Sequence, residues 1–147
     1  MLKKSKPIVG ISVGDPNGIG LEVILKSLED KSVFDECSVI VFSNLKLIKN
    51  QMSYFNIDLH LKEVSDFNNY DERCINVYPI NKKEIKLSYG KLTTEGGIYS
   101  KDSLFAALCS RVVIFIILIL QKKCQILFFY CFQILIQLFF NNREQKI

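Results

Sequence analysis

The first hundred residues alternate short apolar runs with segments of helical periodicity. Residues 8–13 are apolar and mostly β-branched without polar alternation, which indicates a strand covered on both faces of a parallel sheet. Apolar residues then recur at the spacing of one helical face, at Leu21, Ile24, Leu25 and Leu28. Residues 38–42 predict a second buried strand. A strand, a helix and a strand within ~35 residues form a βαβ unit.

The same pattern continues for another sixty residues. A second helix is predicted from the apolar positions Leu45, Ile48, Met52 and Phe55. The stretches "IDLHL", residues 57–61, and "CINVYPI", residues 74–80, predict strands. After two adjacent glycines, Ser100 or Asp102 is expected to cap a helix that runs through Leu108. Residues 1–110 are therefore predicted to form an α/β domain.

The composition changes at Arg111. Of the 30 residues from 111 to 140, 23 are apolar and 18 of these are Ile, Leu or Phe, without Gly, Pro, Asp or Glu, which predicts an apolar, helical tail over 111–147. A membrane helix needs roughly 20 consecutive apolar residues, but Lys122 and Lys123 interrupt this run. Three hypotheses stay open: a membrane-associated segment within 112–140, a buried pair of core helices, or the product of a shifted reading frame in A+T-rich DNA.

Charge and cysteine content exclude several classes of protein. The formal net charge of +4 arises entirely after residue 110, so the domain lacks the clustered Lys and Arg of a nucleic-acid-binding surface. The five cysteines form no CxxC pair, and the single histidine, His60, is distant from them in sequence, so neither a zinc site nor a disulfide framework is indicated. An odd number of cysteines without a secretory signal favours the cytoplasm. His60 lies between Leu59 and Leu61, which predicts an exposed strand histidine.

The candidate chemistry lies in "VGDPNGIGLE", residues 13–22, between the first strand and the first helix. Gly14, Gly18 and Gly20 permit a tight turn and close approach to a ligand, and Pro16 makes the turn rigid. The glycine spacing matches neither the dinucleotide fingerprint nor the P-loop. A bare phosphate site is therefore not indicated.

Two carboxylates in this loop have two possible roles. Asp15 and Glu22 would oppose an anion but would suit a ribose hydroxyl, an ammonium group or a cation. Alternatively, Asp15 closes the turn through its own backbone, and Glu22 complements the dipole of the following helix. The residues alone do not decide between ligand binding and these structural roles.

The loop carries a family resemblance. "ISVGDPNGIGLEVILKSL" resembles the opening of the 4-hydroxythreonine-4-phosphate dehydrogenase family, with its strand and GDPxGIGPE loop. Leu21 replaces the family's usual proline. "GKLTTEGGIYSKDSLFAAL" is also similar to the family segment that leads into a helix of the active-site domain. The resemblance extends from about Ile8 to Leu108.

This resemblance implies a partial three-layer α/β sheet of the isocitrate and isopropylmalate dehydrogenase type. It further implies NAD-dependent oxidation and decarboxylation of 4-phosphohydroxy-L-threonine in vitamin B6 biosynthesis, by a homodimer with a divalent metal held by histidines. The family's metal-ligand region lies beyond the similar part, so no catalytic residue and no metal ligand is carried over. The matching residues are expected to line the active-site cleft or the cofactor site: Gly14, Asp15, Pro16, Gly18, Gly20 and Glu22.

The leading hypothesis is an N-terminal fragment of such a dehydrogenase, interrupted near residues 109–111 and inactive alone. Two alternatives have other functions. One is a small membrane-associated binding protein with the βαβ unit as its head, and the other is a nucleotide-binding module without catalysis.

Overall fold

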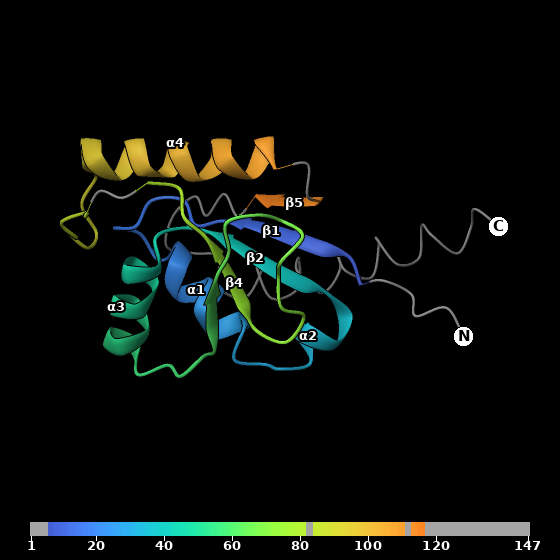
Figure 1. Cartoon of the computed structure of the whole chain (residues 1–147). Coiled ribbons are helices and arrows are strands. Elements are labelled where there is room, and N and C mark those ends of the chain that lie inside the picture. Colours follow the sequence, from blue (N-terminus) through green and yellow to red (C-terminus); the bar gives the residue numbers. More distant parts are fainter. Residues whose placement is uncertain (1–5, 82–83, 111–112, 117–147) are drawn as a thin grey trace, which may run out of the picture.

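A parallel β-sheet with helices on both faces forms the centre of the molecule (Figure 1). The computed structural model describes residues 6–81, 84–110 and 113–116. Within this part of the chain the strands are β1 (Ile8–Ser12), β2 (Ser38–Phe42), β3 (Leu61–Glu63), β4 (Ile75–Tyr78) and β5 (Val113–Ile116). The helices are α1 (Gly20–Ser27), α2 (Val33–Glu36), α3 (Leu45–Phe55) and α4 (Thr94–Cys109). These elements confirm the predicted α/β class.

The order of the strands places a direction change at β1. The sheet runs β3-β4-β2-β1-β5, and β1 pairs in parallel with both β2 and β5. Strands β2, β4 and β3 therefore lie on one side of β1 in the sheet, and β5, which comes last in the chain, lies on its other side. In open parallel sheets, ligands bind at the carboxyl ends of the strands where the strand order reverses. The loop after β1 occupies this position.

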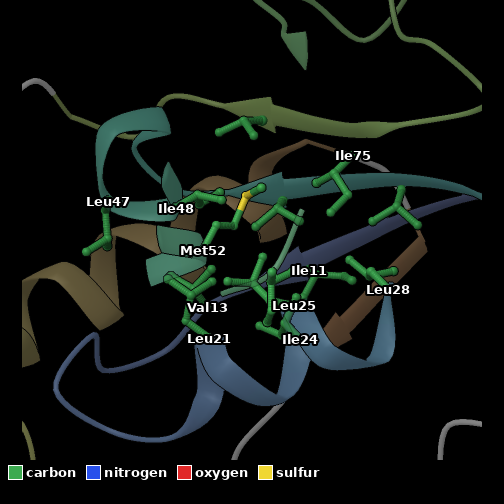
Figure 2. Packing of buried hydrophobic residues seen from close by; sticks show 14 of the residues in the cluster. Ile11, Val13, Leu21, Ile24, Leu25, Leu28, Leu47, Ile48, Met52 and Ile75 are labelled. Carbon is green, nitrogen blue, oxygen red and sulfur yellow. The ribbon is translucent and has the colours of Figure 1, made fainter. Parts of the chain in front are cut away.

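The core lies on both faces of β2. Val39 and Val41 join the cluster beneath α1 and α3, whereas Ile40 and Phe42 pack with Ala107 of α4 on the opposite face. Every residue of β2 is buried, which confirms the prediction of a doubly covered strand. Figure 2 shows the first cluster, in which the apolar stripe of α1 meets α3 and the sheet through Leu21, Ile24, Leu25, Leu28, Ile48 and Met52. Burying each of these side chains contributes about 1.5–3 kcal/mol.

One predicted strand is misplaced, sharing only Leu61 with the observed β3 (Leu61–Glu63). The strand predicted over residues 57–61 begins only at Leu61, because the preceding residues end helix α3. Asn56 adopts a left-handed conformation with φ of 54°, and the Ile57 N–H donates to the Met52 carbonyl oxygen at 2.9 Å. These are the features of a helix C-terminus that turns back on itself. The alternation of apolar and polar residues there belongs to a helix-terminating loop.

Helix α4 begins before the paired glycines, not after them. Its N-cap is Thr93, whose Oγ1 accepts a hydrogen bond from Gly96 N at 3.0 Å. Ser100 and Asp102, the predicted caps, lie inside the helix. The two glycines resembled a turn in the sequence, but the Thr93 cap holds them in the first turns of α4.

The apolar tail contributes one described strand. Residues 113–116 form β5, so the helical prediction is wrong for these four residues. The rest of segment 111–147, including most of the proposed membrane segment 112–140, lies outside the described residues. Within the described ranges, no helix is long and apolar enough to cross a membrane. The domain boundary at residue 110 stays a prediction.

Candidate functional site

The loop between β1 and α1 forms a tight turn closed by Asp15. Gly14 has a φ of 67°, which lies in the left-handed region that glycine favours. The Asp15 Oδ1 atom accepts a hydrogen bond from Asn17 N at 2.9 Å, and the Asp15 carbonyl oxygen accepts one from Gly18 N at 3.0 Å. Pro16 is buried and Gly18 is exposed. The predicted structural role of Asp15, closure of the turn through its own backbone, is confirmed.

Asn17 connects this loop to a distant part of the chain. Its side chain is only 3% exposed, and its Oδ1 atom accepts a hydrogen bond from Ser88 N at 2.7 Å. Its Nδ2 atom donates to Thr93 Oγ1 at 3.0 Å, and its carbonyl oxygen accepts from Gly90 N at 2.9 Å. Asn17 carries no distinctive signal in the sequence, because an asparagine is common in any glycine-rich turn. The structure makes it the connection between the loop and the start of α4.

The loop also lies directly against the first turn of α4. A Cβ atom built on Gly96 would lie 2.5 Å from Asp15 Oδ1 and 2.7 Å from Asn17 Nδ2. The Asp15 carboxylate is therefore held next to a helix N-terminus, where the helix dipole favours negative charge. Gly96 provides the space for this approach, since any larger residue would displace one of these side chains.

The second carboxylate of the motif is engaged along helix α1. Glu22 lies in the first turn of α1, and its Oε1 atom is 2.6 Å from Lys26 Nζ, one helical turn further on. This position agrees with the predicted interaction with the helix dipole. The structure thus places Gly14, Asp15, Pro16 and Gly18 in one turn, and Gly20 and Glu22 at the beginning of α1.

Buried hydroxyl groups fix the ends of the two central strands against α4. Ser103 Oγ donates to the Phe42 carbonyl oxygen at 2.7 Å and accepts from Val13 N at 3.1 Å. It also lies 3.1 Å from Ser12 Oγ. Because a hydroxyl has one proton, and that of Ser103 is used on Phe42, Ser12 is the donor to Ser103. Both serines are buried and act as structural supports beneath the loop.

Tyr99 makes the corresponding connection to the end of β2. Its hydroxyl oxygen accepts from Asn44 N at 2.8 Å and lies 2.9 Å from Ser43 Oγ. Burial raises the pKa of Tyr99 above 10.0, and the hydrogen bonds to Ser43 and Asn44 lower it by less. The neutral phenol therefore remains in place at neutral pH and provides a fixed hydrogen-bonding group.

A cleft opens at the same edge of the sheet, beyond β2 and β4. Its volume is about 360 Å³, and its lining combines the polar residues Asn44, Lys46, Asn81 and Glu84 with apolar ones such as Leu47. Asn44 Nδ2 donates to Asn81 Oδ1 at 3.0 Å, and Lys46 forms an ion pair with Glu84. Sequence patterns gave no sign of this cleft, since its residues come from helix α3, the end of β3 and the segment after β4, which are far apart in sequence.

A metal held by histidines does not fit the residues of this chain. The sequence has one histidine, His60, which is exposed and immediately precedes β3 at the amino edge of the sheet, opposite the β1 loop. Across residues 6–81, 84–110 and 113–116, no three His, Cys, Asp or Glu side chains gather closely enough to hold a metal ion. The prediction that His60 is exposed is confirmed, although it precedes the strand instead of lying within it.

Comparisons with known proteins agree with this architecture. No protein-family model matches the chain. Over 91 residues, 60% of its length, the chain is 33% identical to a Clostridium botulinum protein named "Putative D-threonate 4-phosphate dehydrogenase". It is 25% identical over 96 residues to the 4-hydroxythreonine-4-phosphate dehydrogenase of Bacteroides thetaiotaomicron. These matches confirm the resemblance of the N-terminal part to the 4-hydroxythreonine-4-phosphate dehydrogenase family.

The fold has a counterpart among solved structures. The crystal structure of a 4-hydroxythreonine-4-phosphate dehydrogenase from Burkholderia phymatum superimposes with a TM-score of 0.62 and 22% sequence identity. The superposition covers 77% of this chain and 36% of that structure. The aligned part likewise spans 27% of the Clostridium protein. The similarity therefore concerns one α/β portion of much longer relatives.

Proposed function

We propose that this α/β unit supplies one wall of the active-site cleft of an NAD-dependent dehydrogenase acting on a phosphorylated hydroxy amino acid. The substrate class is that of 4-phosphohydroxy-L-threonine, whose oxidation and decarboxylation serve vitamin B6 biosynthesis. Two facts support the proposal: the similarity of the N-terminal part to such dehydrogenases, and the position of the β1 loop where the strand order reverses. The observation that carries it is the loop geometry, fixed by Asn17 at the carboxyl end of β1.

Asp15 is the residue of this loop that would contact the substrate or cofactor. Its Oδ1 atom is used by Asn17 N, and a carboxylate retains further lone pairs that accept hydrogen bonds from a hydroxyl or ammonium group. A phosphate group would be repelled by the same charge. We therefore assign to Asp15 the recognition of a hydroxyl or ammonium group, with Gly14 and Gly18 allowing the ligand to approach the backbone.

The described residues of this chain lack part of what substrate oxidation requires. When bound, NAD would accept the hydride released from the substrate alcohol. A metal that polarises the hydroxyl in this chemistry would need ligands that the described residues do not bring together. We therefore expect this chain to bind substrate without oxidising it. The homodimer and the cytoplasmic location remain predictions.

The proposal is tested on the purified full chain with 4-phosphohydroxy-L-threonine, NAD and Mg²⁺. Calorimetry should detect saturable substrate binding, whereas absorbance should detect no NADH. The Asp15→Asn variant keeps an oxygen for Asn17 N but removes the charge, and should bind substrate about tenfold more weakly. Glu29→Gln, an equal change of charge at an exposed position, should bind like the unmodified chain. Absence of substrate binding would overturn the proposal, and NADH production would overturn the expected inactivity.

A further inference from the structure

A polar hollow lies at the opposite edge of the sheet from the β1 loop. Its volume is about 680 Å³, and it is lined mainly by polar side chains, including Lys6, Lys31, His60 and Arg73. Hollows of this size are typical of small-molecule sites. We name this hollow, defined by these four residues with Asp35 and Asp58, the amino-edge hollow.

The topology of the sheet explains why these side chains converge. Lys6 precedes β1, His60 immediately precedes β3, and Arg73 lies two residues before β4. In a parallel sheet the amino ends of all strands meet at one edge, so residues far apart in sequence are brought together there. Lys31 joins them from the turn before α2. No motif in the sequence connects these four residues.

The cationic groups are available and their backbone is held in place. The ion pairs formed within the described residues, Lys26 with Glu22 and Lys46 with Glu84, use other charges. Lys6 Nζ donates to the Phe34 carbonyl oxygen at 2.7 Å, which leaves two of its three protons for a ligand.

Two aspartate turns hold the backbone beside the other cations. Asp71 Oδ1 accepts from Arg73 N at 2.9 Å, and Asp30 Oδ1 accepts from Ser32 N at 3.0 Å, next to Lys31. Such turns limit the motion of the backbone that carries Lys31 and Arg73.

We propose that the amino-edge hollow binds the phosphate group of a small phosphorylated polyol. Arg73 and the two lysines supply donors for phosphate oxygens, and His60 adds an imidazole N–H. Arg is well suited to this role because its guanidinium donates two parallel hydrogen bonds to one phosphate. Asp35 and Asp58 lie in the same hollow, where they oppose the phosphate charge but would accept hydrogen bonds from hydroxyl groups of the ligand. Arg73 and the two lysines outnumber them. This site is separate from the loop that contains Asp15 and does not depend on the function proposed for it.

The test is calorimetric titration of the full chain, at low ionic strength, with inorganic phosphate and separately with glycerol 3-phosphate. We expect saturable binding of one ligand per chain, at least tenfold weaker in the Lys31→Gln, Arg73→Gln double variant. The control variant Lys49→Gln, Lys101→Gln removes the same charge from exposed positions elsewhere and should keep the affinity of the unmodified chain.

Tighter binding of glycerol 3-phosphate would identify a phosphate monoester as the ligand, and equal affinities would identify the phosphate ion itself. The proposal is overturned if neither compound binds saturably. It is also overturned if the control variant loses as much affinity as the double variant, because the attraction would then reflect net charge alone. Circular dichroism of both variants establishes that the fold is retained.

Discussion

Asn17 Nδ2 donates a hydrogen bond to Thr93 Oγ1 at 3.0 Å, across 76 residues of sequence. Thr93 Oγ1 in turn accepts from Gly96 N and so caps α4. One hydrogen-bonded connection thus sets both the shape of the β1 loop and the beginning of α4. A mutation that breaks this connection is therefore expected to change both the loop between β1 and α1 and the beginning of α4.

Replacing Asn17 with Ala should destabilise the fold by about 2–3 kcal/mol. The substitution leaves Ser88 N without its side-chain acceptor in a partly buried position and removes the donor to Thr93. Urea unfolding of the full chain measures the change in the free energy of unfolding. Asn68→Ala, at an exposed position, is the matched control and should change stability by less than about 0.5 kcal/mol. Equal effects of the two substitutions would contradict the role given to Asn17.

The adjacent glycines of α4 should respond oppositely to the same substitution. Gly96→Ala introduces a Cβ 2.5 Å from Asp15 Oδ1 and should cost about 1–3 kcal/mol of unfolding free energy. Gly97→Ala meets nothing within 4 Å and should stabilise the helix by about 0.5–1 kcal/mol. Both glycines lie in helix α4, so a difference between the unfolding curves of the two variants reports on what surrounds each position. A destabilised Gly97→Ala variant with an unaffected Gly96→Ala variant would mean that the loop does not contact α4 as described.

Local periodicity was sufficient to predict most of the sheet and two of the helices. The doubly buried runs of β1 and β2 and the one-sided apolar spacing of α1 are properties of a few consecutive residues, so the sequence alone revealed them. The same patterns failed where a tertiary contact decides the outcome. Gly96 and Gly97 suggest a turn by composition, but α4 includes them because Thr93 caps the helix and Gly96 accommodates Asp15.

The candidate site likewise has a part that the sequence predicts and a part that only the fold reveals. The turn closed by Asp15 spans two residues, and its chemistry could be predicted from the loop itself. Asn17 acts on Ser88 and Thr93, at separations of 71 and 76 residues, and no spacing rule connects them. Lys6, His60 and Arg73 of the amino-edge hollow likewise meet only because parallel strands begin at one edge.

Tyr99→Phe should destabilise the fold by about 1–3 kcal/mol. The substitution preserves the volume of the ring but removes the hydroxyl that accepts from Asn44 N and pairs with Ser43 Oγ. Tyr54→Phe is the control, since the Tyr54 side chain is 68% exposed, and should be nearly neutral. Both variants can be compared by urea unfolding. If Tyr99→Phe were as stable as the unmodified chain, the buried hydroxyl network would not hold β2 against α4.

Stability should decrease as the pH rises from 9 towards 11, because of Cys37. Burial is the main cause that raises the pKa of the Cys37 thiol from 9.0 to about 11, with the neighbouring Glu36 carboxylate adding to the effect. In this window the folded chain keeps a thiol proton that the unfolded chain has lost. The free energy of unfolding therefore falls with rising pH, by at most about 1.4 kcal/mol per pH unit from this group.

Urea unfolding at several pH values between 8.5 and 11 measures how the free energy of unfolding depends on pH. The decrease is expected to begin at about pH 9. The Cys37→Ala variant should show a shallower decrease, because alanine does not ionise. Cys109→Ala, which removes an exposed thiol, should keep the steeper decrease of the unmodified chain. Parallel curves for the two variants would mean that Cys37 is not the group responsible. The remaining decrease is assigned to Cys74, Tyr89 and Tyr99, because burial raises the pKa of each of these groups in the same direction.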